Sequence, residues 1–413
     1  MNTSSASAPS FSLRPILFAY MCGTMAMMAF VAVIGPLSRH LGLLPWQAGL
    51  AVTAGGLLWM VAAPIWGQLS DRHGRRRILV TGFAGFFISY LAMGIGLIAA
   101  MHVPMASWLV FAGLVATRGA VGGFYAAAPT ASQALIADNL PPERRVNAMA
   151  SLGTANGVGL VLGPALAGQL AWFGLEAPLY LTTLLPLLGL VALWKYLPDA
   201  PPPAGGRRGG RSLLTDPRLR RPMLTAFTAL FTVSASQIAV GFFVIDQLGM
   251  SPEAGARTAG NALGMVGIAL ILSQLVVRRL TLRPIPMIRI GMGVAGLGFV
   301  SVMLVTQSWM LMASYFVAAS GMGFVFPAFS ALAANSVQPN EQGAAAGAVG
   351  AAQGLGTVLG PLAGAMLLQV TPGLPYAVSG VLLALVAIWV GLGLPTDDGQ
   401  RPDRTTGPDS ASD

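Results

Sequence analysis

Charged residues are scarce in this chain of 413 residues: Asp, Glu, Lys and Arg together make up 9% of it, whereas 55% is hydrophobic. About a quarter of an average soluble domain is charged, and so few polar groups cannot cover the surface of a water-soluble protein. The mean hydropathy is +0.71. The composition therefore excludes an ordinary soluble protein and predicts that most of the chain lies in a lipid bilayer.

Cysteine and lysine are almost absent. The single cysteine, Cys22, lies within an apolar run, which excludes an internal disulfide framework and a thiolate metal cluster. The single lysine, Lys195, follows no Gly-rich loop, so the chain has no phosphate-binding loop for ATP. The histidines, His40, His73 and His102, fall in three separate loops, and we expect neither a metal site nor another cofactor. A gradient or a partner is expected to drive any work that the protein does.

Long apolar runs are what the chain does have. A membrane-spanning helix needs about 20 apolar residues, and runs of this kind fall at roughly 15–37, 46–69, 78–100, 107–134, 145–173, 178–197, 222–246, 259–277, 285–306, 309–334, 342–370 and 374–394. We therefore expect an all-α membrane protein with twelve transmembrane helices.

A polar segment divides these runs into six and six. Residues 198–221 are rich in Pro, Gly and Arg, which is typical of a solvated linker. The expected organisation is an N-terminal six-helix bundle (1–197), a cytoplasmic linker (198–221), a C-terminal six-helix bundle (222–394) and a disordered cytoplasmic tail (395–413).

The two halves resemble each other in sequence. GVGLVLGPALAG at residues 157–168 recurs as GLGTVLGPLAGA at residues 354–365. Internal duplication is typical of transporters in which two halves move about a central site. The pattern predicts two pseudo-symmetric bundles.

The positive charges predict the orientation. Of the 23 basic residues, all except Arg39, Arg118 and Arg257 fall on segments that share one side of the membrane with the N-terminus. By the positive-inside rule this side is the cytoplasm, so both termini are expected there, in a multi-pass plasma membrane protein of the bacterial inner-membrane type. The net charge of +9 then reflects topology, and we expect no nucleic-acid partner.

The most specific string is GQLSDRHGRRR at residues 67–77. Gly67 lets two helices approach closely, Asp71 can cap a helix or pair with an arginine, and Gly74 permits a tight reversal of the chain. The three arginines at 75–77 alone would also fit a basic loop that only sets topology.

This string resembles the signature loop of the major facilitator superfamily, and the twelve-helix plan matches that family over nearly the whole chain. In that family the loop is taken to latch the two halves together in the outward-open state. The resemblance implies this gating role for Gly67, Asp71, Arg72, Gly74, Arg75, Arg76 and Arg77. The corresponding loop of the second half, at 278–289, keeps neither the Asp nor the Gly, so only one latch is expected.

Arg118 stands within an apolar span, where a charge costs on the order of 3 kcal/mol and is expected to point into the bundle or a wet cavity. Its spacing to Gly122 resembles the second signature of proton-coupled facilitators, which implies a role in proton transfer or in recognition of substrate charge. The alternative is structural glue. No Asp or Glu lies deep in a span, so we expect coupling through Arg118 with Asp138, or a substrate whose own carboxylate pairs with Arg118.

Glycine and proline recur together in the fifth and eleventh runs. Small residues four apart let helices pack backbone to backbone, and proline kinks a helix. The glycine-rich segment around Gly163 and Pro164 resembles a motif of the antiporter branches of the superfamily, and this resemblance implies export. The alternative is that these residues only allow tight helix packing, as in any polytopic membrane protein. The packing residues are Gly159, Gly163, Pro164, Gly168, Gly360 and Pro361.

Polar and aromatic side chains in the spans are candidates for a substrate pocket, or else for bonds between helices. They are Tyr20, Thr24, Tyr125, Asn156, Ser236, Gln237, Asn261, Tyr315 and Gln353.

These observations predict a secondary active transporter and not an enzyme. We expect a proton-coupled exporter of a small amphipathic or anionic compound, such as a drug or a siderophore-like metabolite, that works by alternating access and functions as a monomer. Its expected partners are this small molecule, protons and the lipid bilayer. An importer of a siderophore, organic acid or other metabolite is the alternative within transport, and a non-transporting receptor or scaffold is a remote one.

Overall fold

The protein is helical throughout the part that the computed structural model describes, which is all of the chain except residues 1–11, 199–212, 278, 280–281, 339–340 and 393–413. The α-helices are α1 (Arg14–His40), α2 (Pro45–His73), α3 (Arg75–His102), α4 (Ser107–Tyr125), α5 (Ala127–Asn139), α6 (Pro142–Leu170), α7 (Ala177–Tyr196), α8 (Arg220–Asp246), α9 (Pro252–Val277), α10 (Pro284–Ser301), α11 (Ser308–Asn335), α12 (Gln342–Leu368) and α13 (Leu374–Gly391). Short 3-10 turns lie at η1 (Ala171–Phe173), η2 (Pro217–Leu219) and η3 (Val302–Leu304).

Among the described residues, twelve helical segments are long and apolar enough to cross a membrane, because α4 and α5 together form one span, Ser107–Asn139. This confirms the expected all-α membrane fold. Helix α9 begins at Pro252, seven residues before the apolar run, because its first turn is polar and carries Glu253. The expected tail at 395–413 and most of the expected linker lie outside the described residues.

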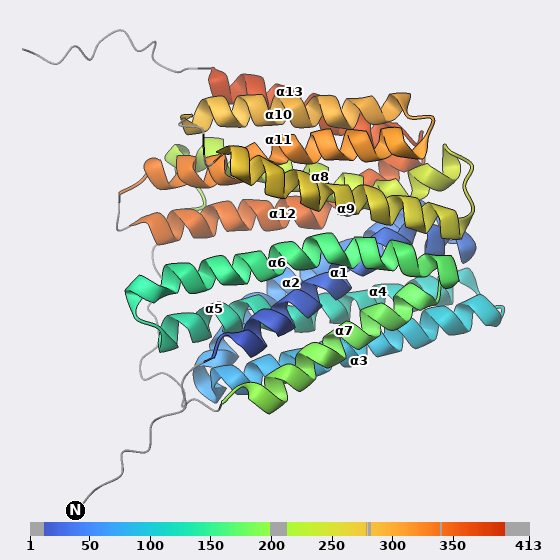
Figure 1. The fold of residues 1–413 in the computed structure, drawn as a ribbon, viewed down its shortest axis with the longest axis horizontal. Coiled ribbons are helices and arrows are strands. Elements are labelled where there is room, and N and C mark those ends of the chain that lie inside the picture. Colours follow the sequence, from blue (N-terminus) through green and yellow to red (C-terminus); the bar gives the residue numbers. More distant parts are fainter. Residues whose placement is uncertain (1–11, 199–212, 278, 280–281, 339–340, 393–413) are drawn as a thin grey trace, which may run out of the picture.

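The helices form two bundles, α1–α7 largely below and α8–α13 above in Figure 1. Helix α1 packs against α6 and α7 in the first bundle, and α8 packs against α12 in the second. The bundles meet where α6 packs on α9 and where α2 packs on α12. We call the end at which α2 turns into α3 the latch end, and the opposite end the far end.

Glycines permit the same close packing in both bundles. A Cβ added at Gly163 of α6 would lie 2.5 Å from the carbonyl oxygen of Met25 in α1, and one at Gly360 of α12 would lie 2.5 Å from that of Phe231 in α8. Both helices continue through the proline that follows the glycine. The repeated string therefore seats α6 on α1 and α12 on α8, as a duplicated structure requires.

Small residues also bring the two bundles together, at positions toward the far end. A Cβ at Gly35 of α1 would lie 2.8 Å from Cα of Gly241 in α8, and one at Gly168 of α6 would lie 2.9 Å from Cα of Gly260 in α9. A Cβ at Gly49 of α2 would likewise strike the backbone of α12. At these glycines the two bundles thus approach each other backbone against backbone.

Candidate functional site

Arg118 of α4 is buried in the first bundle, with 2% of its surface exposed. Its Nη1 atom donates to Sδ of Met27 at 3.2 Å, and its guanidinium carbon lies 5.2 Å from the ring centroid of Phe30. Its Nε has no hydrogen-bond partner, and among the described residues no carboxylate lies within ion-pair distance. Sulfur and an aromatic face compensate a buried charge only in part. The Arg118 guanidinium is thus buried without a carboxylate counter-charge among the described residues.

Three of the expected pocket residues come together about two helical turns from Arg118. Oγ1 of Thr24 in α1 donates to Oδ1 of Asn156 in α6 at 2.9 Å, and it lies 2.9 Å from the hydroxyl of Tyr125 in α4. A threonine hydroxyl has one proton, so Tyr125 must donate to Thr24. Gly23 leaves room for the Tyr125 ring, since a Cβ there would overlap it. This cluster joins three helices of the first bundle.

The other pocket candidates lie elsewhere. Tyr315 is buried in the second bundle, where its hydroxyl donates to the carbonyl oxygen of Ser236 at 2.8 Å, so both residues join helices there. Asn261 accepts a hydrogen bond from Gln169 at 2.8 Å, between α9 and α6. The remaining candidates are half-buried and make no side-chain hydrogen bond to the described residues. They are Tyr20, Gln237 and Gln353.

The latch loop is organised around Arg75, which is buried. Arg75 pairs with Asp71, donates to Oδ2 of Asp138 at 2.8 Å and donates to Oγ of Ser70 at 3.1 Å. Gly74 separates α2 from α3 with φ of +91°, a conformation that L side chains rarely adopt. The structure thus places Asp138 in the latch cluster and not beside Arg118, with which coupling was expected.

The rest of the latch loop lies around this cluster. Arg76 donates to the carbonyl oxygen of Trp194 in α7 at 2.7 Å, while Arg72 and Arg77 are exposed. Gly67 lies against α5, where an added Cβ would be 3.4 Å from Thr130. These bonds of Arg75 and Arg76 stay within the first bundle.

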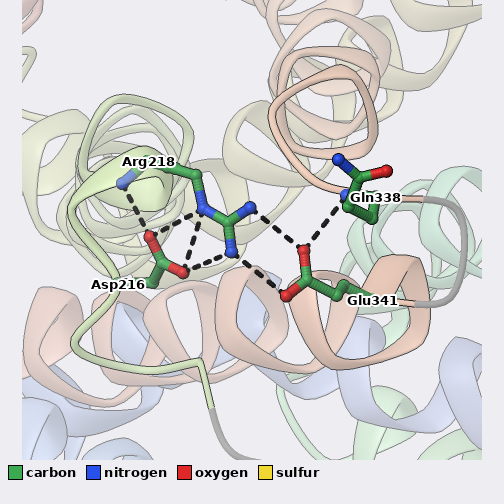
Figure 2. Close-up of polar contacts among 4 residues, drawn as sticks. All are labelled: Asp216, Arg218, Gln338 and Glu341. Carbon is green, nitrogen blue, oxygen red and sulfur yellow. Dashed lines mark hydrogen bonds and ion pairs between the residues drawn. The ribbon is translucent and has the colours of Figure 1, made fainter.

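A second ion cluster at the latch end belongs to the second bundle (Figure 2). Arg218 donates to Asp216 at 2.8 Å and to Glu341 at 3.0 Å, and Glu341 also accepts from the backbone N–H of Gln338 at 3.1 Å. Arg218, and then the Gln338 N–H, hold the pKa of Glu341 below its ordinary value. The cluster ties the segment before α8 to the start of α12. Sequence reasoning missed it, because 123 residues separate Arg218 from Glu341.

At the far end an ion pair joins the two bundles. Nη2 of Arg39 in α1 lies 2.5 Å from Oδ2 of Asp246 in α8, and the Arg39 guanidinium lies 5.3 Å from the ring centroid of Phe242. The hydroxyl of Thr53 in α2 donates to the carbonyl oxygen of Val358 in α12 at 2.8 Å. Together with the side-chain bond from α6 to α9, these contacts close the far half of the interface.

Toward the latch end, α6 and α12 border open space. A Cβ added at Gly153, Gly157, Gly350 or Gly354 would meet no atom within 4 Å. The same two helices are seated tightly farther along, at Gly163 and Gly360. The close contacts of α6 and α12 with their neighbours are therefore concentrated toward the far end.

Twelve membrane-length helices, packed in two bundles in the described part of the chain, define a polytopic membrane protein. A family model described as the Major Facilitator Superfamily matches residues 16–308 and 284–412. The chain belongs to the major facilitator superfamily, which makes it a multi-pass membrane transporter and not an enzyme.

Curated relatives and solved structures agree with this family. The chain is 28% identical over 345 residues to the tetracycline resistance protein, class G, of Vibrio anguillarum, which covers 79% of this chain and 81% of that one. Its fold is similar to that of a bacterial homolog of the human lysosomal transporter Spinster in an inward-facing conformation, with a TM-score of 0.72, 17% identity and 92% and 95% of the two chains covered. It also resembles the human organic anion transporter MFSD10, with a TM-score of 0.62, 19% identity and 92% and 98% covered.

Proposed function

We propose that the protein exports a small anionic or amphipathic compound in exchange for protons, by alternating access. The observation that carries this proposal is Arg118, a buried cation without a carboxylate partner among the described residues. Burying a lone charge costs several kcal/mol unless a partner satisfies it. A substrate with a carboxylate or similar anion would supply the missing partner.

The surroundings of Arg118 fit an amphipathic compound. The cluster of Thr24, Tyr125 and Asn156 offers hydroxyl and amide groups about 10 Å farther along α4, at 1.5 Å of helix rise per residue. Trp59 and Phe86 pack on the Tyr125 ring and surround it with apolar side chains. A compound with one anionic end and a ring body would match this order of groups.

The latch end faces the cytoplasm in this proposal, because the positive-inside rule assigns the arginine-rich ends of the helices to that side. The far end, closed by Arg39 and Asp246, then faces outside. The structure would represent the state in which an exporter takes up its compound from the cell. The similarity to a tetracycline resistance protein supports export over import.

Accumulation in cells tests this proposal. Cells that express the protein, cells with Arg118→Gln and cells with the matched control Arg144→Gln, an exposed arginine, receive a panel of labelled antibiotics, siderophores and organic acids. We expect wild type and the control to lower accumulation of at least one anionic compound, a protonophore to abolish the effect, and Arg118→Gln to lack it. Raised accumulation would favour an importer, and no change for any compound would favour a receptor or scaffold.

A further inference from the structure

A groove on the lipid-facing side of the second bundle is not part of the transport site. It lies between α10 and α13, which pack side by side at the upper edge of Figure 1. Its volume is about 430 Å³, and its lining consists of Pro286, Arg289, Ile290, Ala387 and Ile388. It is located at the latch end, where α10 begins and α13 ends.

The groove combines one positive charge with an apolar wall. Arg289 is exposed, and it makes no hydrogen bond or ion pair to another described residue. Its guanidinium lies over Gly391, where an added Cβ would be 2.9 Å from Nε, so the glycine makes room for it. Ile290 and Ile388 are more than half exposed on the same groove. In a membrane, the chemistry that meets such isoleucines is a lipid acyl chain.

The corresponding helices of the first bundle make a different contact. There α3 and α7 occupy the places that α10 and α13 occupy in the second bundle, and Arg76 bridges them by donating to the Trp194 carbonyl oxygen at 2.7 Å. In the second bundle the carbonyl oxygen of Leu392, just after α13, accepts from Arg221 at 2.6 Å instead. Arg289 thus lies over the last residue of α13, beside the groove, without a hydrogen bond to the carbonyl oxygen of Leu392.

The depth of Arg289 in the membrane also fits binding of a lipid headgroup. Arg289 lies five residues after the start of α10, which is about 7 Å of helix, and a long arginine side chain reaches back toward the interface. Basic pockets between helices at this level bind anionic lipid headgroups. We propose that this groove binds an anionic phospholipid, with its phosphate on Arg289 and an acyl chain along Ile290 and Ile388.

Lipid retention by the purified full-length protein tests this proposal. Native mass spectrometry measures the occupancy of added phosphatidylglycerol, and phosphatidylcholine serves as the zwitterionic comparison. We expect wild type to prefer phosphatidylglycerol, and Arg289→Gln to lower its occupancy about fivefold, the effect of one basic residue near a membrane surface. Arg144→Gln removes another exposed arginine outside the groove and should leave the preference unchanged.

A second variant tests the acyl-chain contact separately from the headgroup contact at Arg289. Ala387→Phe fills the groove but leaves Arg289 in place, and it should lower occupancy by both lipids while the protein stays monodisperse. Equal phosphatidylglycerol occupancy in wild type and Arg289→Gln would overturn the proposal. So would displacement of the lipid by inorganic phosphate at equal concentration, which would assign the site to the free anion. None of these outcomes depends on whether the protein transports anything.

Discussion

Removing the ion pair between Arg39 and Asp246 should shift the protein toward a state that is open at the far end. Their side chains are 33% and 25% exposed, so solvent screens the pair and its loss costs about 1 kcal/mol. That energy changes the ratio of closed to open molecules about fivefold. Arg39→Gln also removes the cation–π contact with Phe242, worth about 0.5–1 kcal/mol more. Its shift should therefore exceed that of Asp246→Asn.

Spin-label distances across the far end measure this shift. Labels at Leu44 and Gln247, both exposed, report on the two bundles after Cys22→Ser removes the native thiol. We expect a longer-distance population that grows in the order wild type, Asp246→Asn, Arg39→Gln. The exchange of the two charges, Arg39→Asp with Asp246→Arg, should restore most of the closed population, and salt near 1 M should open wild type but not the neutral variants.

Two results would refute this reasoning. Identical distance distributions in wild type and both neutral variants would show that the pair does not hold the far end closed. A charge exchange that opens the far end more than either single change would show that local packing, and not attraction between the two charges, keeps the bundles together.

Three further changes have defined outcomes. Gly168→Val adds atoms at a position where even a Cβ would lie 2.9 Å from the backbone of α9, so transport measured in a flux assay should fall at least tenfold. The control Gly157→Ala adds a methyl group in open space and should leave transport unchanged. Arg75→Gln leaves two part-exposed carboxylates without their shared partner and should lower stability by about 1–2 kcal/mol, seen as a lower Tm. Glu341→Gln should lower Tm at pH 7, and the difference from wild type should shrink as pH falls through the lowered pKa of Glu341, because its ionised form is what Arg218 stabilises. A difference in Tm that grows toward acid would contradict this last sign.

Sequence reasoning succeeded where the signal is local. Apolar runs gave the twelve spans because a bilayer fixes their length. It placed the start of α9 too late, because the first turn at Pro252 and Glu253 is polar. It also did not foresee that the fourth span breaks at Ala126 into α4 and α5, although Pro129 lacks the N–H that would bond to the carbonyl oxygen of Tyr125.

Pairings between distant residues could not be predicted. Thr24, Tyr125 and Asn156 each stood out as polar groups in apolar spans, but 101 and 132 residues separate Thr24 from its two partners. Asp138 was correctly noted as a carboxylate at a helix end, yet only the packing of α3 against α5 shows that Arg75 is its partner. One sequence carries no measure of which helices become neighbours.

Proton movement in inside-out vesicles tests whether the protein exchanges protons for an anionic compound. The vesicles hold an acid interior reported by a quenched pH dye, and an anionic compound identified by the accumulation panel is added to the outside. If the protein exchanges protons for an anionic substrate through Arg118, the compound releases the quench in wild-type vesicles and not in Arg118→Ala vesicles. An equal release in both, or no release although wild-type cells export the compound, would contradict the account.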